Sequence, residues 1–166
     1  MSLTFAGVTS LARSVHRAME GGFGSTGRAT TILTLASQDE RYQPVASQGM
    51  PSLEDALRAA AALPARALVL TTACWTAETS GPGVAHLPLA DLPMPADLPA
   101  GQRGEALVTT AVLHGQRSAL RIMSTLTRGP QGPALGAAVE STRELDRLDG
   151  MAAFLGDVLN RVHHAR

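Results

Sequence analysis

Lysine is absent from this 166-residue chain, so all 14 basic residues are arginines, and they are balanced by 14 acidic residues. A formal net charge of zero removes the long-range attraction that draws basic proteins to phosphate backbones. It also gives little electrostatic repulsion between copies of the chain. The charge balance therefore predicts no nucleic-acid partner and favours self-association, with a homodimer as the expected form.

Cysteine and long apolar runs are scarce as well. Cys74 is the one cysteine, which excludes a disulfide framework or a thiolate metal cage. No run approaches the roughly 20 apolar residues of a membrane helix, so we expect no membrane partner. Arg13, His16 and Arg17 interrupt the apolar region that a secretory signal would need. Lysine-free, alanine-rich composition is typical of a GC-rich genome, and we expect a bacterial, cytoplasmic protein.

Hydrophobic residues make up 45% of the chain and charged residues 17%, which is enough to build one packed core. The length fits one domain, and we assign residues 1–166 to a single α+β domain. Residues 79–103 contain five prolines that interrupt regular structure. A loop of this length is usually functional or mobile, so it is either a lid or a fixed cover over the body.

Three segments have the 3.6-residue periodicity of an amphipathic helix. The first extends from Val8 to Met19, and Gly21 and Gly22 are expected to end it. The second begins after Ser52, whose hydroxyl can accept from the N–H of Asp55, and it ends at Pro64.

The third helix is predicted from its capping residues and its apolar stripe. Ser141 and Glu144 match the capping box, in which side chain and backbone satisfy each other at a helix start. The apolar residues that follow recur at alternating spacings of three and four: Leu145, Leu148, Ala152, Leu155, Leu159 and Val162. This stripe favours packing on the domain's own sheet over a coiled-coil dimer seam.

Five or six strands are predicted at 29–36, 41–47, 66–77, 105–113 and 117–127, with a short one at 135–139. Pro44 lacks an N–H and places the second strand at an edge. Residues 66–77 are apolar on both faces and should form a central strand. The order α-β-β-α-β-β-β-α with hairpin connections predicts a mainly antiparallel sheet. This order resembles that of profilin-like and roadblock-type regulatory domains, which implies a non-catalytic role.

The sequence Gly22-Phe-Gly-Ser-Thr-Gly27 satisfies the dinucleotide pattern GxGxxG. That pattern binds pyrophosphate only where a strand enters the loop and a helix leaves it. Here a helix enters and a strand leaves. The related phosphate loop would need lysine and a hydroxyl residue where Arg28 and Ala29 stand. We therefore interpret the segment as a helix-to-strand connection and expect no cofactor.

Other potential sites have structural interpretations. The five histidines contain no pair at i, i+4 and no HExxH motif, so we expect no specific metal site. Cys74 lies within an apolar strand, where a free cysteine usually acts as a small hydrophobic residue. Arg117 and Arg121 share one strand face without interleaved aromatic residues, which favours a solvated face or a protein contact.

Polar residues flank the proline-rich loop where it leaves one strand and enters the next. Trp75 and Glu78 precede the loop, and Arg103 and Glu105 follow it. If the two strands are neighbours, these side chains meet at one end of the sheet, where Arg128 can join them. Trp75 would be a platform and an arginine a bidentate donor for a small polar ligand. In the alternative, Trp75 is core and the charges form ion pairs that fix the loop.

Two functional hypotheses follow, and the sequence does not settle whether the protein is an enzyme. The first is a non-catalytic interaction or assembly domain that self-associates or binds a protein partner. The second is a small-molecule-binding protein or hydrolase that uses the Trp75, Glu78, Arg103, Glu105 and Arg128 end of the sheet.

Overall fold

A seven-stranded antiparallel sheet forms the centre of the computed structural model, which describes residues 2–27, 30–76, 97–145 and 150–165. The strands are β1 (Thr31–Ser37), β2 (Tyr42–Ser47), β3 (Ala65–Thr76), β4 (Gly104–Leu113), β5 (Ser118–Gly129), β6 (Gly132–Leu135) and β7 (Val139–Glu144). Their order across the sheet is β2-β1-β3-β4-β5-β6, and β7 pairs with β5 beside β6. This confirms the predicted α+β class and element order, with seven strands where five or six were expected.

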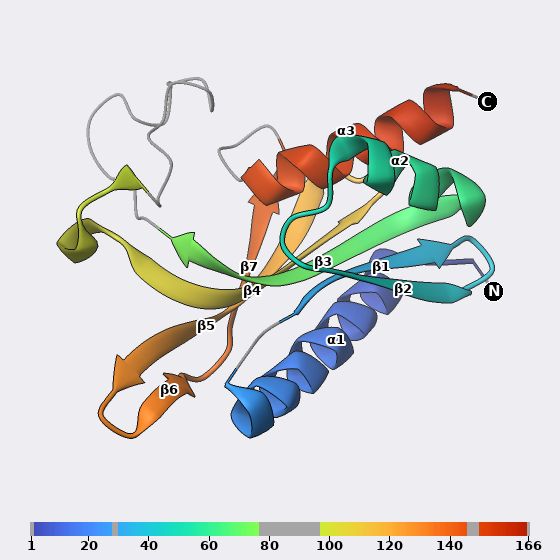
Figure 1. Ribbon diagram of the computed structural model, residues 1–166. Coiled ribbons are helices and arrows are strands. Elements are labelled where there is room, and N and C mark those ends of the chain that lie inside the picture. The colour runs from blue at the N-terminus through green and yellow to red at the C-terminus, as the bar shows by residue number, and fades with distance from the viewer. Residues whose placement is uncertain (1, 28–29, 77–96, 146–149, 166) are drawn as a thin grey trace.

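Helix α1 (Phe5–Thr26) covers one face of the sheet, while α2 (Leu53–Ala62) and α3 (Gly150–His164) cover the other (Figure 1). Two apolar clusters follow from this arrangement. Beneath α2 and α3, the core includes Leu33, Leu68, Leu70, Leu155 and Leu159. Beneath α1, it includes Val8, Ala12, Val69, Ala111 and Ile122. Alternation along β3 sends Leu68 and Leu70 to one cluster and Val69 to the other, as expected for a central strand.

The prediction that Gly21 and Gly22 end the first helix is wrong. Helix α1 continues through both to Thr26, and Gly27 closes it in the left-handed conformation with φ 64°. Phe23, only 4% exposed, packs against the body from this last turn. Burial of that ring offsets the roughly 1 kcal/mol that each helical glycine costs relative to alanine. The GxGxxG segment is therefore mostly helix, and the helix leads into strand β1 as predicted.

The predicted N-terminal cap of α2 is confirmed. The Ser52 hydroxyl accepts from the Asp55 N–H at 3.1 Å, and Glu54 and Asp55 lie in the first turn. Strand β2 lies at the sheet edge, as Pro44 indicates, and pairs only with β1 among the described strands. The proline-rich segment lies mostly outside the described residues; its end includes a short 3-10 turn, Ala100–Gln102.

The capping box at Ser141 and Glu144 was a wrong prediction. Both residues belong to β7, which pairs antiparallel with residues 118–123 of β5, and α3 begins only at Gly150. The single short strand expected at 135–139 is instead two, β6 and β7. Four residues of the predicted stripe lie on α3 and are buried against the sheet as expected: Ala152, Leu155, Leu159 and Val162. Leu145 precedes the helix, and Leu148 lies outside the described residues.

Candidate functional site

Four of the five residues predicted to meet at the loop end of the sheet lie together. Trp75 on β3 is directly opposite Glu105 on β4, so the two side chains share a sheet face. The Arg103 guanidinium carbon lies 4.3 Å from the centre of the Trp75 ring, a cation–π distance. Arg128, near the end of β5, bonds to Glu105. Glu78 lies outside the described residues. We call Trp75, Arg103, Glu105 and Arg128 the Trp75 cluster.

Arg128 and Glu105 form an ion pair within this cluster. Arg128 donates from Nε and from Nη2 to the two Glu105 carboxylate oxygens, at 2.6 and 2.9 Å. These hydrogen bonds lower the pKa of Glu105, and the charges of Arg128 and Arg103 act in the same direction, while partial burial opposes them. The same pairing raises the pKa of Arg128. Glu105 is therefore held as a carboxylate and is not a proton donor at neutral pH.

Trp75 is not core, contrary to one of the two interpretations of the sequence. Its side chain is 43% exposed, among the large apolar side chains that reach solvent. The neighbouring Cys74 points to the opposite sheet face by alternation and is half-buried rather than fully buried as expected. The cluster thus presents a braced indole and paired charges at the surface, without a nucleophile among its four side chains.

A second polar region, which the sequence reasoning missed, lies between α1 and the sheet. His16 on α1 is 2% exposed. Its Nδ1 lies 2.8 Å from the Thr109 hydroxyl of β4, and its Nε2 lies 2.9 Å from the Ser124 hydroxyl of β5. The Thr109 hydroxyl also meets that of Thr71 at 2.7 Å. These hydrogen bonds satisfy a buried imidazole that would otherwise be costly.

Thr71, Thr109, His16, Ser124 and Glu20 form a buried chain of hydrogen bonds, which we call the buried chain. Its donors and acceptors can be assigned by starting from the Glu20 carboxylate. Ser124 donates its hydroxyl proton to Glu20 Oε1 at 2.6 Å, since a carboxylate only accepts. Ser124 then accepts from His16 Nε2–H, so His16 Nδ1 is the acceptor for Thr109. Burial lowers the pKa of His16, while Glu20 and Glu140 partly oppose that effect. With His16 neutral, Thr109 donates to His16, His16 donates to Ser124, and Ser124 donates to Glu20.

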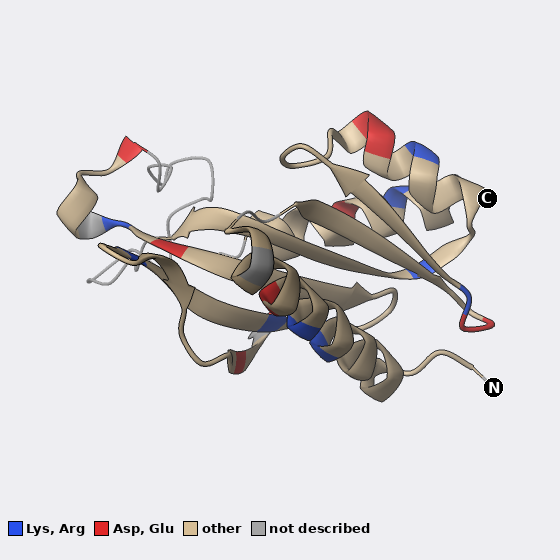
Figure 2. Ribbon diagram, turned by 60° about the horizontal axis from the view of Figure 1, so that its bottom comes forward, with Lys and Arg blue, Asp and Glu red and all other residues tan. Residues whose placement is uncertain are grey.

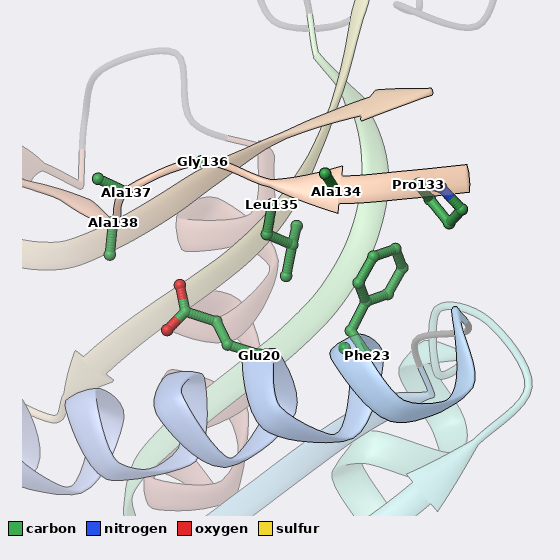
Figure 3. Close-up of a pocket in the computed structure, with 9 residues that line it drawn as sticks. Glu20, Phe23, Pro133, Ala134, Leu135, Gly136, Ala137 and Ala138 are labelled. Atoms are coloured by element: carbon green, nitrogen blue, oxygen red, sulfur yellow. The ribbon is translucent and has the colours of Figure 1, made fainter. Parts of the chain in front are cut away.

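Glu20 also lines a pocket of about 530 Å³ between the end of α1 and the β6–β7 segment. Figure 3 shows the Glu20 carboxylate and the Phe23 ring extending from α1 toward Leu135 and its neighbours. The opposite wall is formed by residues 133–138, which include Pro133, Ala134 and Leu135. The pocket thus combines one charged side chain with small and apolar side chains, a combination that can hold a small molecule.

The buried chain and the Trp75 cluster lie on the same sheet face. Ser124, Leu126 and Arg128 alternate along β5, so all three point to the α1 side. Ser124 and Arg128 are four positions apart, which is roughly 13 Å along a strand. A sequence signal for the buried chain did exist, because His16 falls on the helix face of Val8, Ala12 and Phe23.

Two other described histidines, His114 and His163, lie in a structural contact. Within the described parts of the chain, no group of three or more His, Cys, Asp or Glu side chains is placed to hold a metal ion. His114 and His163 stack with ring centres 3.9 Å apart, and His163 Nε2 bonds to the Ala65 carbonyl at 3.0 Å. This contact fastens the end of α3 to the sheet.

Comparisons with family models, with curated proteins and with solved structures found no match for this chain. Among the described residues, no helix is both long and apolar enough to span a membrane.

Proposed function

We propose that this chain is a non-catalytic interaction domain that associates with a second copy of itself through the Trp75 cluster. The observation that carries the proposal is the exposed indole of Trp75, 43% exposed and braced by Arg103 at 4.3 Å. The same proposal has the domain act in the cytoplasm, where a chain with one cysteine is ordinary.

Residue type supports this surface. Tryptophan and arginine are enriched among the few residues that dominate the energy of protein interfaces. A tryptophan fixed by a cation–π contact loses little side-chain freedom on binding, so more of its burial energy remains for association. The Glu105–Arg128 pair beside it would form part of a polar rim, where charges guide orientation more than affinity.

The charge balance of the whole chain allows a second copy as the partner. A chain with no net charge does not repel its own kind, and basic and acidic positions are interspersed along the ribbon in Figure 2. A two-fold interface brings the same patch of both copies together, so the Glu105–Arg128 pairs of the two copies would both contribute to it. The β2 edge is a weaker site for self-pairing, because Pro44 has no N–H to donate to an added strand.

Light scattering at tens of micromolar, where a specific contact should persist, tests the proposal. We expect the mass of a dimer. Trp75→Ser should weaken the dimer at least about tenfold, since interface hot spots typically cost about 2 kcal/mol or more on truncation. Tyr42→Ser is the matched control, because Tyr42 is an aromatic residue of similar exposure, 47%, on the edge strand β2.

Fluorescence gives an independent measurement, because Trp75 is the only tryptophan in the chain. Its emission should shift to shorter wavelength as the concentration rises and the indole leaves water. A strict monomer throughout this range would reject self-association. A dimer that Trp75→Ser leaves intact would move the interface away from the cluster.

A second function is favoured by the direct contacts within the same cluster. Trp75, Arg103, Glu105 and Arg128 lie within a ligand's width, as a binding site for a small polar molecule requires. Binding would have to compete with the Glu105–Arg128 pair for the arginine. Its signature would be saturable quenching of Trp75 emission by a small dicarboxylate such as succinate, lost in Arg128→Gln.

A further inference from the structure

The pocket beside α1 has features that the proposed interaction surface does not use. It occupies about 530 Å³, within the range of small-molecule sites. Glu20 is the one charged residue among the described residues that line it. Gly24, one helical turn beyond Glu20, lines the same side, and a Cβ built there would meet no atom within 4 Å. The missing side chain at Gly24 therefore leaves the space above the helix open.

The buried side chains of Ser124 and His16 hold the Glu20 carboxylate in place. The Ser124 hydroxyl donates to its Oε1 at 2.6 Å, and His16 Nε2 lies 3.5 Å from the same oxygen. Ser124 is 0% exposed and His16 2%, so both supporting side chains are buried in the core. One oxygen is thus fixed by the protein, and the other is available to a molecule in the pocket. Preorganisation of this kind lowers the entropy cost of binding.

The charge environment favours a cation. Among the described residues, no arginine lies within ion-pair distance of Glu20. Arg13, on the same helix, pairs with Glu140 at 2.7 Å instead. The pocket also lies at the C-terminal end of α1, where the helix dipole is negative and the last turn contains no basic residue. Phe23, Pro133 and Leu135 supply apolar surface for an organic body next to the charge.

We propose that this pocket binds a small primary amine with an apolar body, with the ammonium group on Glu20 and the body against Phe23 and residues 133–138. The ammonium would donate to the free carboxylate oxygen, and the apolar part would replace water along the small side chains of the wall. A carboxylate ligand is disfavoured by the charge of Glu20. The site is separate from the Trp75 cluster, so it does not depend on self-association.

The test uses 2-phenylethylamine as the probe and follows backbone amide signals of the whole chain by NMR. A neutral analogue of the same shape, 2-phenylethanol, and an anionic one, 3-phenylpropionate, are titrated in parallel. We expect saturable shifts at Glu20, Phe23 and residues 133–138 with the amine, and at least about tenfold weaker binding of the other two.

Two pairs of variants make the result specific. Glu20→Gln should weaken amine binding about tenfold or more, while Glu54→Gln, an exposed carboxylate on α2, should not change it. Gly24→Leu should fill the pocket and abolish binding, while Gly21→Leu, also in open space on α1 but outside the lining, should leave it intact. If Glu20→Gln does not fold, the comparison of Gly24→Leu with Gly21→Leu tests the proposal by itself.

The proposal is overturned by any of three results. These are an absence of saturable amine shifts, equal binding of 2-phenylethanol, or amine binding that Glu20→Gln and Gly24→Leu leave unchanged.

Discussion

Replacement of His16 by leucine tests the buried hydrogen-bond chain directly. Leucine has a similar volume, so the main loss is the two ring hydrogen bonds, to Thr109 at 2.8 Å and to Ser124 at 2.9 Å. A typical buried hydrogen bond contributes about 1 kcal/mol net, so His16→Leu should lower the free energy of unfolding by about 2 kcal/mol. Ser124→Ala loses the His16 bond and the bond to the Glu20 carboxylate, which together contribute about 3 kcal/mol.

The double variant separates this account from simple loss of packing. The His16–Ser124 bond is removed in both single variants but only once in the double, so the double should be about 1 kcal/mol more stable than the sum predicts. Urea denaturation at pH 8, where His16 is neutral, measures all four proteins with a common m-value as the check on two-state unfolding. Additivity within about 0.4 kcal/mol would refute the direct bond between these side chains.

Two further predictions concern pH and the end of α1. Burial lowers the pKa of both His16 and His114 from 6.5, so each binds a proton less readily when folded, and the free energy of unfolding should fall as pH drops below about 6.5. Urea curves at pH 8, 7, 6 and 5.5 measure this fall, and His16→Leu should reduce it; a flat profile contradicts the assignment. Gly27→Ala should destabilise by about 1–2 kcal/mol because φ is 64°, whereas Gly21→Ala in the helix should stabilise by roughly 1 kcal/mol. Thermal denaturation compares these two variants, and equal melting temperatures would contradict the prediction.

Local signals in the sequence were sufficient where the local structure is set by nearest neighbours. Ser52 begins α2 as predicted because its hydroxyl and the Asp55 N–H are three residues apart and need no tertiary contact. The capping box at Ser141 and Glu144 is an equally good local pattern, yet both residues join β7. The available edge of β5 provided a ladder of backbone hydrogen bonds that the local pattern could not reveal.

The glycines of α1 show the same competition in the opposite direction. Gly21 and Gly22 favour a stop by propensity, but the helix face of Val8, Ala12 and Phe23 continues to pack on the sheet. Tertiary burial of that face outweighs the glycine cost, so propensity alone placed the helix end at Gly21 instead of Gly27.

The residues of a candidate site could be predicted to meet only where their strands could be predicted to be neighbours. The hypothesis that β3 and β4 are neighbours brought Trp75, Arg103 and Glu105 together correctly. The buried chain needs more, because the Thr109 and Ser124 hydroxyls reach one imidazole only when the register of β4 and β5 is known. Periodicity places His16 on the inward face of α1, but it does not specify which hydroxyls will meet it.

The strand order also constrains how the chain folds. Of the six pairings, β1–β2, β3–β4, β4–β5 and β5–β6 join strands consecutive in sequence, while β1–β3 and β5–β7 do not. The β4–β5 hairpin has the shorter connection, closed by the turn with Gly115 at φ 84°, and so has the smaller loop-closure entropy of the two pairings of β4. We expect this hairpin to nucleate folding, with the β1–β2 hairpin docking onto β3 later, once α2 has brought the two halves of the sheet together.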